Sequence, residues 1–153
     1  MTVRIKSQGA ELAVRDFGGE GEAVVLLHGG PGVPDYLAPV AEMLRPQYRA
    51  VTFDQRGVGS SVATQHRYEL DDYTSDLEAV REGLGLSSMH LFGHSWGGLL
   101  AQAYLQRFPD RVRSLFLSSP SAGLGAQWKT TQREVFRFNR RQSGAVGFAA
   151  MGP

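Results

Sequence analysis

The sequence predicts an α/β fold in which a mostly parallel sheet is flanked by helices. Strand-like and helix-like segments alternate along most of the 153 residues, as they do in parallel βαβ units. The segment 23–27 is a continuous apolar run with valines at its centre, which is typical of a strand buried on both faces. Glycine-rich polar loops follow three expected strands, at 28–32, 54–61 and 93–97. Such loops lie together at the carboxyl ends of parallel strands, where ligands bind.

Apolar runs and turn signals predict the strands. They are expected at 3–7, 11–17, 23–27, 48–53, 89–93 and 112–117. Three helices are expected between or after them: 35–45 with Asp35 as N-cap, a second from Asp71 or Asp72 to about Gly83, and 96–108, which Pro109 ends. In the second helix, residues at helical spacing predict the buried face: Tyr73, Leu77, Val80 and Leu84.

Composition excludes several functional classes. A net charge of +1 argues against a nucleic-acid or membrane-surface partner, because such proteins usually carry a strong basic excess. The absence of cysteine excludes disulfides, thiolate metal sites and a cysteine nucleophile. Neither a signal peptide nor a membrane-spanning apolar stretch is recognisable. We therefore expect a cytoplasmic protein.

Gly93-His94-Ser95-Trp96-Gly97 matches the G-x-S-x-G nucleophile elbow, a sharp strand-to-helix turn that exposes a serine hydroxyl. A strand is expected before it and a helix after it, which favours an elbow over a chance match. Ser95 is therefore the expected nucleophile. Because the helix begins directly after Ser95, the backbone N–H of Trp96 is expected to donate to a developing oxyanion.

His28-Gly29-Gly30-Pro31-Gly32 follows the apolar strand. Its glycines would let backbone N–H groups approach a ligand closely, so Gly30, or else Gly29, is expected to supply the second oxyanion donor. His28 is expected to be a structural hydrogen-bonding residue. The loop lacks the lysine and Ser/Thr of a phosphate-binding P-loop, and no cofactor or metal is expected.

The third loop is Asp54-Gln55-Arg56-Gly57-Val58-Gly59-Ser60-Ser61. We interpret it as a polar turn held by an internal ion pair between Asp54 and Arg56. In this interpretation the two residues shape the rim of the site and take no part in chemistry.

Together these motifs resemble the N-terminal part of α/β-hydrolases of the proline iminopeptidase type, a family of serine peptidases. The resemblance covers roughly residues 20–120 and includes the stretch Phe108-Pro109-Asp110-Arg111-Val112. The elbow alone also fits esterases and lipases, whereas the combination with the other two loops is more specific. One departure is His94, where many such peptidases have glycine and esterase-like relatives often have histidine.

The resemblance implies that Ser95 is the nucleophile and that the N–H groups of Gly30 and Trp96 form the oxyanion hole. It implies a small peptide or amide substrate from which an N-terminal residue, most often proline, is removed. The alternatives are an esterase or amidase of the same fold, acting on an ester substrate, and a non-catalytic remnant or binding module. The serine at position 95 disfavours an epoxide hydrolase or dehalogenase, which uses an aspartate nucleophile.

The resemblance also divides the chain. Residues 1–120 would be a partial α/β-hydrolase core, incomplete at its C-terminal edge, and residues 121–153 the start of a helical cap. Within the second part, 127–141 is expected to form a helix with a basic side. We interpret that side as the solvated face of a cap helix rather than a surface for an anionic partner, because no charge elsewhere supports the latter.

In this fold a carboxylate and a histidine base follow the serine in the sequence. The four histidines of this chain all precede Ser95: His28, His66, His90 and His94. His94 should point away from Ser95 because neighbouring strand side chains alternate, which leaves His66 as the alternative base. We therefore expect the triad Asp and His to be absent and the chain to be a fragment, part of a split enzyme or an inactive remnant.

Strand 112–117 would then be an exposed apolar edge. Unpaired strand edges recruit other chains. We therefore expect self-association or completion by a separate C-terminal polypeptide.

Overall fold

A computed structural model describes residues 1–121, 130 and 134. Within this part of the chain, seven strands form one sheet of order β1-β2-β4-β3-β6-β7, with β5 paired to β2 outside that path. The strands are β1 Thr2–Ser7, β2 Ala10–Asp16, β3 Ala23–Leu27, β4 Arg49–Phe53, β5 Val62–Ala63, β6 Met89–His94 and β7 Val112–Ser118. β4, β3, β6 and β7 run parallel, whereas β1, β2 and β5 pair in antiparallel fashion. The predicted α/β class is confirmed, with a mixed sheet.

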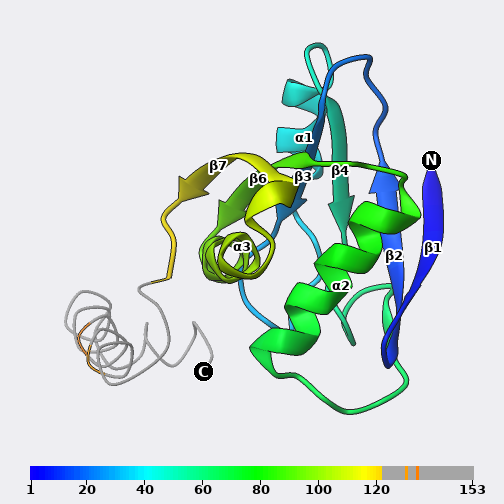
Figure 1. Ribbon diagram of the computed structural model, residues 1–153. Helices are drawn as coiled ribbons and strands as arrows, with labels where there is room; N and C mark the ends of the chain where they lie inside the picture. Colours follow the sequence, from blue (N-terminus) through cyan, green and yellow to red (C-terminus); the bar gives the residue numbers. More distant parts are fainter. Residues whose placement is uncertain (122–129, 131–133, 135–153) are drawn as a thin grey trace, which may run out of the picture. The chain divides into compact units, whose positions relative to one another are not determined.

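Helices cover both faces of this sheet (Figure 1). They are α1 Ala38–Leu44, α2 Leu70–Gly83 and α3 Trp96–Arg107, followed by a 3₁₀ turn at Pro109–Arg111. α2 and α3 pack over one face and α1 over the other, and each face has its own apolar core. β3 is buried along its whole length, as its continuous apolar sequence predicts.

The helix caps differ from those expected. The N-cap of α2 is Glu69, whose backbone N–H donates to Asp72 Oδ2 at 3.1 Å, so Asp71 and Asp72 lie inside the first turn. α1 begins three residues after Asp35, whose carboxylate accepts the N–H of Leu37 at 2.9 Å without capping the helix. At α2 the acidic residues Glu69, Asp71 and Asp72 are chemically similar cap candidates, whereas at α1 the N-cap is Leu37, which makes no side-chain capping hydrogen bond.

The chain divides into two compact units, Met1–Pro120 and Ser121–Pro153. The helix predicted at 127–141 lies outside the described residues except for Thr130 and Glu134, so the assignment of 121–153 to a cap stays a prediction. Among the described helices, none has the length and apolar character that crossing a membrane requires.

The sheet order brings the three glycine-rich loops together. β4, β3 and β6 are adjacent parallel strands, and each is followed at its carboxyl end by one of these loops. Neighbouring strands lie about 5 Å apart, so the loops at 28–32, 54–61 and 93–97 share one edge of the sheet, as the sequence predicts.

Candidate active site

Ser95 lies at the junction between β6 and α3 in a backbone conformation that L-residues rarely adopt. Its φ is 53° and its ψ is −117°. The residue before it ends the strand β6, and the residue after it, Trp96, is the first of helix α3. Two backbone hydrogen bonds hold the turn: the Ser95 N–H donates to Ser118 O at 3.1 Å, and the Gly98 N–H donates to Ser95 O at 3.0 Å. Such a conformation costs about 1–3 kcal/mol and persists only where the surroundings impose it. The strand–turn–helix context expected of an elbow is therefore present.

The loop after β3 approaches Ser95 closely. A Cβ atom placed on Gly29 would lie 2.9 Å from Ser95 Cβ and 2.6 Å from the hydroxyl of Tyr36, so only glycine fits here. Gly30 has a φ of 62°, which also favours glycine. The predicted oxyanion loop and the predicted nucleophile are thus neighbours in space.

The three predicted backbone donors differ in their partners. The Gly29 N–H already donates to Tyr36 Oη at 2.9 Å. Trp96 is the first residue of α3, so its N–H has no acceptor within the helix. No hydrogen bond from the Gly30 N–H is found within the described residues. Unlike the Gly29 N–H, those of Trp96 and Gly30 are therefore not committed to a side-chain hydroxyl.

Tyr36 is a residue that sequence reasoning missed. Its hydroxyl lies 2.5 Å from His94 Nδ1 and accepts from the Gly29 N–H, and its ring meets the imidazole edge-on at 5.7 Å between centroids. It ties the side chain of His94 to the loop after β3. No sequence signal marks Tyr36, because a single aromatic residue in a loop has many uses.

Gln55 joins all three loops, and this role was also missed. Its side chain donates to His28 O at 2.9 Å and accepts from Trp96 Nε1 at 3.1 Å. Its backbone N–H donates to His28 Nε2 at 3.2 Å, while His28 Nδ1 lies 3.0 Å from Gly29 O. Both Gln55 and His28 are fully buried. His28 therefore uses both ring nitrogens in holding the loops, in line with its predicted structural role.

The internal ion pair predicted between Asp54 and Arg56 is wrong. Asp54 instead pairs with Arg15 Nη2 at 2.5 Å and accepts the N–H groups of Asp35 and Ser60 at 2.9 and 3.0 Å. The two side chains face different elements: Asp54 faces Arg15 on β2, and Arg56 faces Asp76 on α2. Asp54 still organises the rim, but it does so by joining β2 and the segment before α1 to its own loop.

Arg56 reaches α2. Its Nε and Nη2 donate to the carboxylate of Asp76 at 2.7 and 2.8 Å, and both side chains are about 1% exposed. The remaining donors bind backbone carbonyls of Gln8, Arg67 and Asp72. Burial would lower the pKa of Arg56, but the hydrogen bonds and charge of Asp76 raise it above its ordinary value.

His66 is not brought to Ser95. It is exposed, and the N–H groups of Thr64 and Gln65 just before it bind Gly9 O at the β1–β2 turn. β2 is separated from β6 by β4 and β3, which corresponds to about 14 Å across the sheet. His66 as a substitute base has no support in this arrangement. Nor do the described residues contain any group of three or more His, Asp or Glu that could hold a metal ion.

Asp54 should make the stability of the rim depend on pH. Burial would raise its pKa, but the N–H groups of Ser60 and Asp35 and the Arg15 guanidinium together hold it below its ordinary value. A lowered pKa in the folded state stabilises the protein above the unfolded pKa of about 4, and this stabilisation is lost as the pH falls further.

We expect Asp54→Asn to lower the free energy of unfolding at pH 6 by about 1–3 kcal/mol. The difference from the unsubstituted protein should shrink on going to pH 3. Urea unfolding at both pH values measures it, with Glu20→Gln as the exposed control. A difference that is constant over this range would contradict the assignment.

A family model described as the alpha/beta hydrolase fold matches residues 22–153 of this chain. That match covers most of the sequence and agrees with the sheet order and the strand–serine–helix turn. The chain belongs to the α/β-hydrolase fold family.

Within this family, named relatives include peptidases and esterases. The proline iminopeptidase of Lactobacillus helveticus is 40% identical over 118 residues, which are 73% of this chain and 40% of that protein. The structure of a proline iminopeptidase-related protein from Thermus thermophilus superposes with a TM-score of 0.69 at 32% identity, over 78% of this chain and 44% of that one. An esterase from Exiguobacterium antarcticum gives 0.73 at 28% identity, over 92% and 57%. The chain spans about two fifths of the length of the curated proline iminopeptidases that it matches.

Proposed function

We propose that this chain carries the nucleophile and oxyanion loops of a serine hydrolase that removes an N-terminal residue, most often proline, from peptides or amides. The observation that supports this most directly is Ser95, held at a positive φ between β6 and α3 with the Gly29 backbone against its Cβ. The curated relatives named proline iminopeptidase favour the peptidase over other chemistry.

In the proposed reaction, Ser95 Oγ attacks the carbonyl carbon of the residue to be removed. The oxyanion that forms is stabilised by the N–H of Trp96, at the N-terminus of α3, and by that of Gly30. The amine leaves with a proton, and water then hydrolyses the acyl-enzyme. We propose that the histidine base and its carboxylate come from a further polypeptide segment, because no histidine follows Ser95 here and the curated relatives are longer.

A fluorophosphonate probe tests the role of Ser95. We expect the probe to label Ser95, which lies in the tryptic peptide 82–107, and Ser95→Ala to remove that adduct. An oxyanion hole without the full triad still leaves about 10³–10⁴-fold catalysis over water, so a slow reaction is sufficient. Ser119→Ala is the matched control, since Ser119 also has a positive φ but precedes no described helix. An unlabelled Ser95 would favour the non-catalytic remnant or binding module.

The second candidate is an esterase or amidase of the same fold. It is favoured by His94, whose imidazole meets Tyr36 at the rim, and by the similarity to the Exiguobacterium esterase. Hydrolysis of proline arylamide compared with short acyl esters, by the chain together with the segment that supplies its base, separates the two candidates. Preference for the ester by more than a factor of ten in kcat/KM would overturn the peptidase.

A further inference from the structure

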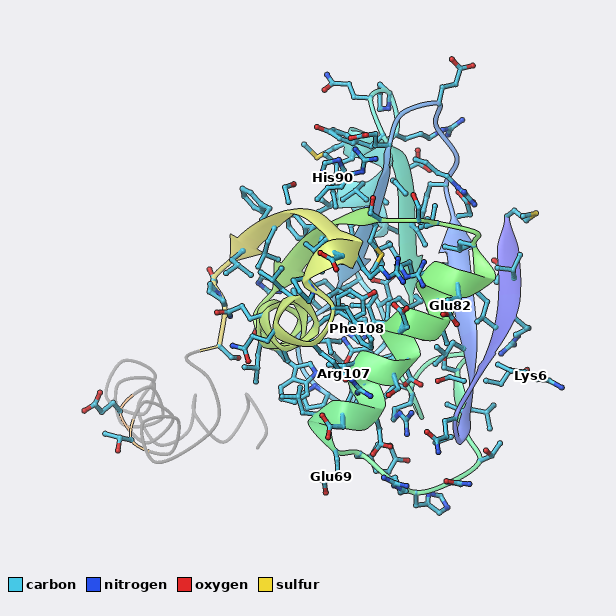
Figure 2. The ribbon with its side chains drawn as sticks, viewed as in Figure 1. Lys6, Glu69, Glu82, His90, Arg107 and Phe108 are labelled. Atoms are coloured by element: carbon cyan, nitrogen blue, oxygen red, sulfur yellow. The ribbon has the colours of Figure 1, made fainter. Side chains whose placement is uncertain are left out.

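A second serine–histidine–carboxylate arrangement lies where β6 and β7 begin. His90 Nδ1 is 2.7 Å from Ser114 Oγ, and His90 Nε2 is 2.8 Å from Glu22 Oε2. His90 and Ser114 are direct partners in the β6–β7 ladder, so the strand register holds them against each other. Figure 2 shows His90 near α1 and apart from Glu69 and Glu82 at the two ends of α2. About 16 Å of strand separates His90 from Ser95, so this cluster is distinct from the site above.

Glu22 determines which nitrogen of His90 accepts a proton. A carboxylate only accepts hydrogen bonds, so the Nε2 that faces Glu22 carries the hydrogen and Nδ1 is left to accept from the Ser114 hydroxyl. The hydrogen bond from His90 lowers the pKa of Glu22 below its ordinary value, and the positive charge of Arg113 adds to this. Arg113 Nη1 lies 2.5 Å from Glu22 Oε1, while Arg113 Nε donates to Ser88 Oγ at 2.9 Å. Ser114 thus faces an oriented base, as a nucleophilic serine requires.

An apolar groove of about 360 Å³ opens beside these groups. His90 and Ser114 form its polar part, and the Phe92 and Phe116 rings stack at 5.2 Å between centroids along one wall. Phe116 is 61% exposed, so this wall is accessible to a ligand. The remaining lining residues come from β3, α1, the residue before β4, and β6: Val24, Val40, Leu44, Tyr48 and Leu91. Such a pocket suits a ligand with an apolar body and one polar group.

We propose that Ser114 is a second nucleophile, which accepts an acyl group from apolar carboxylic esters bound in this groove. Ser114 Oγ attacks the ester carbonyl carbon and its proton passes to His90 Nδ1. The C–O bond to the alcohol breaks, the alcohol takes that proton, and acyl-Ser114 remains. Water then releases the carboxylic acid and restores the hydroxyl.

The chemistry should be limited to esters with a good leaving group. Ser114 lies within β7 and, unlike Ser95, does not directly precede a helix whose N-terminus would stabilise the developing oxyanion. An aryl ester or a fluorophosphonate needs little such stabilisation, whereas an amide needs much more. This proposal does not depend on the function proposed for Ser95.

The test uses the full chain carrying Ser95→Ala and an apolar fluorophosphonate. Trypsin places Ser114 in the peptide 114–129, apart from 82–107, and fragmentation of the peptide distinguishes Ser114 from the serines that follow it. We expect an adduct on Ser114 that Ser114→Ala removes. His90→Gln should slow its formation at least tenfold, since general-base assistance contributes factors of about 10²–10⁴. Ser88→Ala is the matched control, because Ser88 contacts Arg113 rather than a histidine, and it should leave the rate unchanged.

Circular dichroism and urea unfolding check that each variant folds. If His90→Gln does not fold, the labelling rate of Glu22→Gln tests the proposal instead. The side chain of Glu22 is 54% exposed, so we expect this variant to fold. We expect a several-fold slower reaction for Glu22→Gln. Absence of an adduct on Ser114, or a labelling rate that neither His90→Gln nor Glu22→Gln changes, would overturn the proposal.

Discussion

Replacing Asp76 by alanine should lower the free energy of unfolding by about 3–5 kcal/mol. The substitution removes two hydrogen bonds, at 2.7 and 2.8 Å, from a guanidinium that is about 1% exposed. Arg56 would keep its bonds to backbone carbonyls but lose the carboxylate that balances its charge. Asp72 Oδ1, 3.7 Å from Arg56 Nη1, compensates only in part. Urea unfolding of the two proteins measures the difference.

The surface pair Glu42–Arg45 is the matched control. It lies at 3.4 Å, but both side chains are more than half exposed, so Glu42→Ala should cost less than about 1 kcal/mol. The double variant Arg56→Met with Asp76→Leu should recover part of the loss: it leaves no guanidinium without its carboxylate, while the carbonyl groups of Gln8, Arg67 and Asp72 lose a donor. A cost for Asp76→Ala no larger than that for Glu42→Ala would contradict the role given to this pair.

The Arg56–Asp76 pair also shows what the sequence could and could not predict about the site. The motif around Arg56 marked a loop that organises the rim, and the loop does so. Its partner lies 20 residues away on α2, and the choice between Asp54 and Asp76 depends on which element packs above the loop. Charge and spacing along the chain cannot decide that, because both carboxylates are compatible with the same guanidinium.

Sequence reasoning predicted the backbone structure better than it predicted which side chains contact each other. The strand 23–27 was predicted to the residue, since an uninterrupted apolar run in a central strand leaves little freedom. The turn at Ser95 was predicted because flanking glycines are needed wherever backbone segments approach closely. Tyr36 and Gln55 were not recognised, since the contacts through which each acts join loops that are distant in sequence.

Gly97→Ala should destabilise the protein by about 3 kcal/mol or more, and it should disturb the elbow at the same time. A Cβ atom on Gly97 would lie 2.0 Å from Leu27 O, 2.5 Å from Leu27 C and 2.7 Å from His28 O. These are backbone atoms at the end of β3, which cannot rotate away as a side chain can. Either α3 or the loop beginning at His28 must therefore move. We expect both a lower urea midpoint and slower fluorophosphonate labelling of Ser95.

Gly83→Ala, at the end of α2, separates crowding from helix propensity. A Cβ atom there would come within 2.8 Å of Ile5 Cδ1 and 3.1 Å of its Cγ1 and Cγ2, which are side-chain rather than backbone atoms. Alanine also favours helix over glycine by about 1 kcal/mol, so this control should cost much less than Gly97→Ala. If the Gly97→Ala protein were as stable as the Gly83→Ala protein, the backbone at the end of β3 would be able to move at little cost in free energy. In that case the close approach of β3 and α3 would not be what holds Ser95 in its strained conformation.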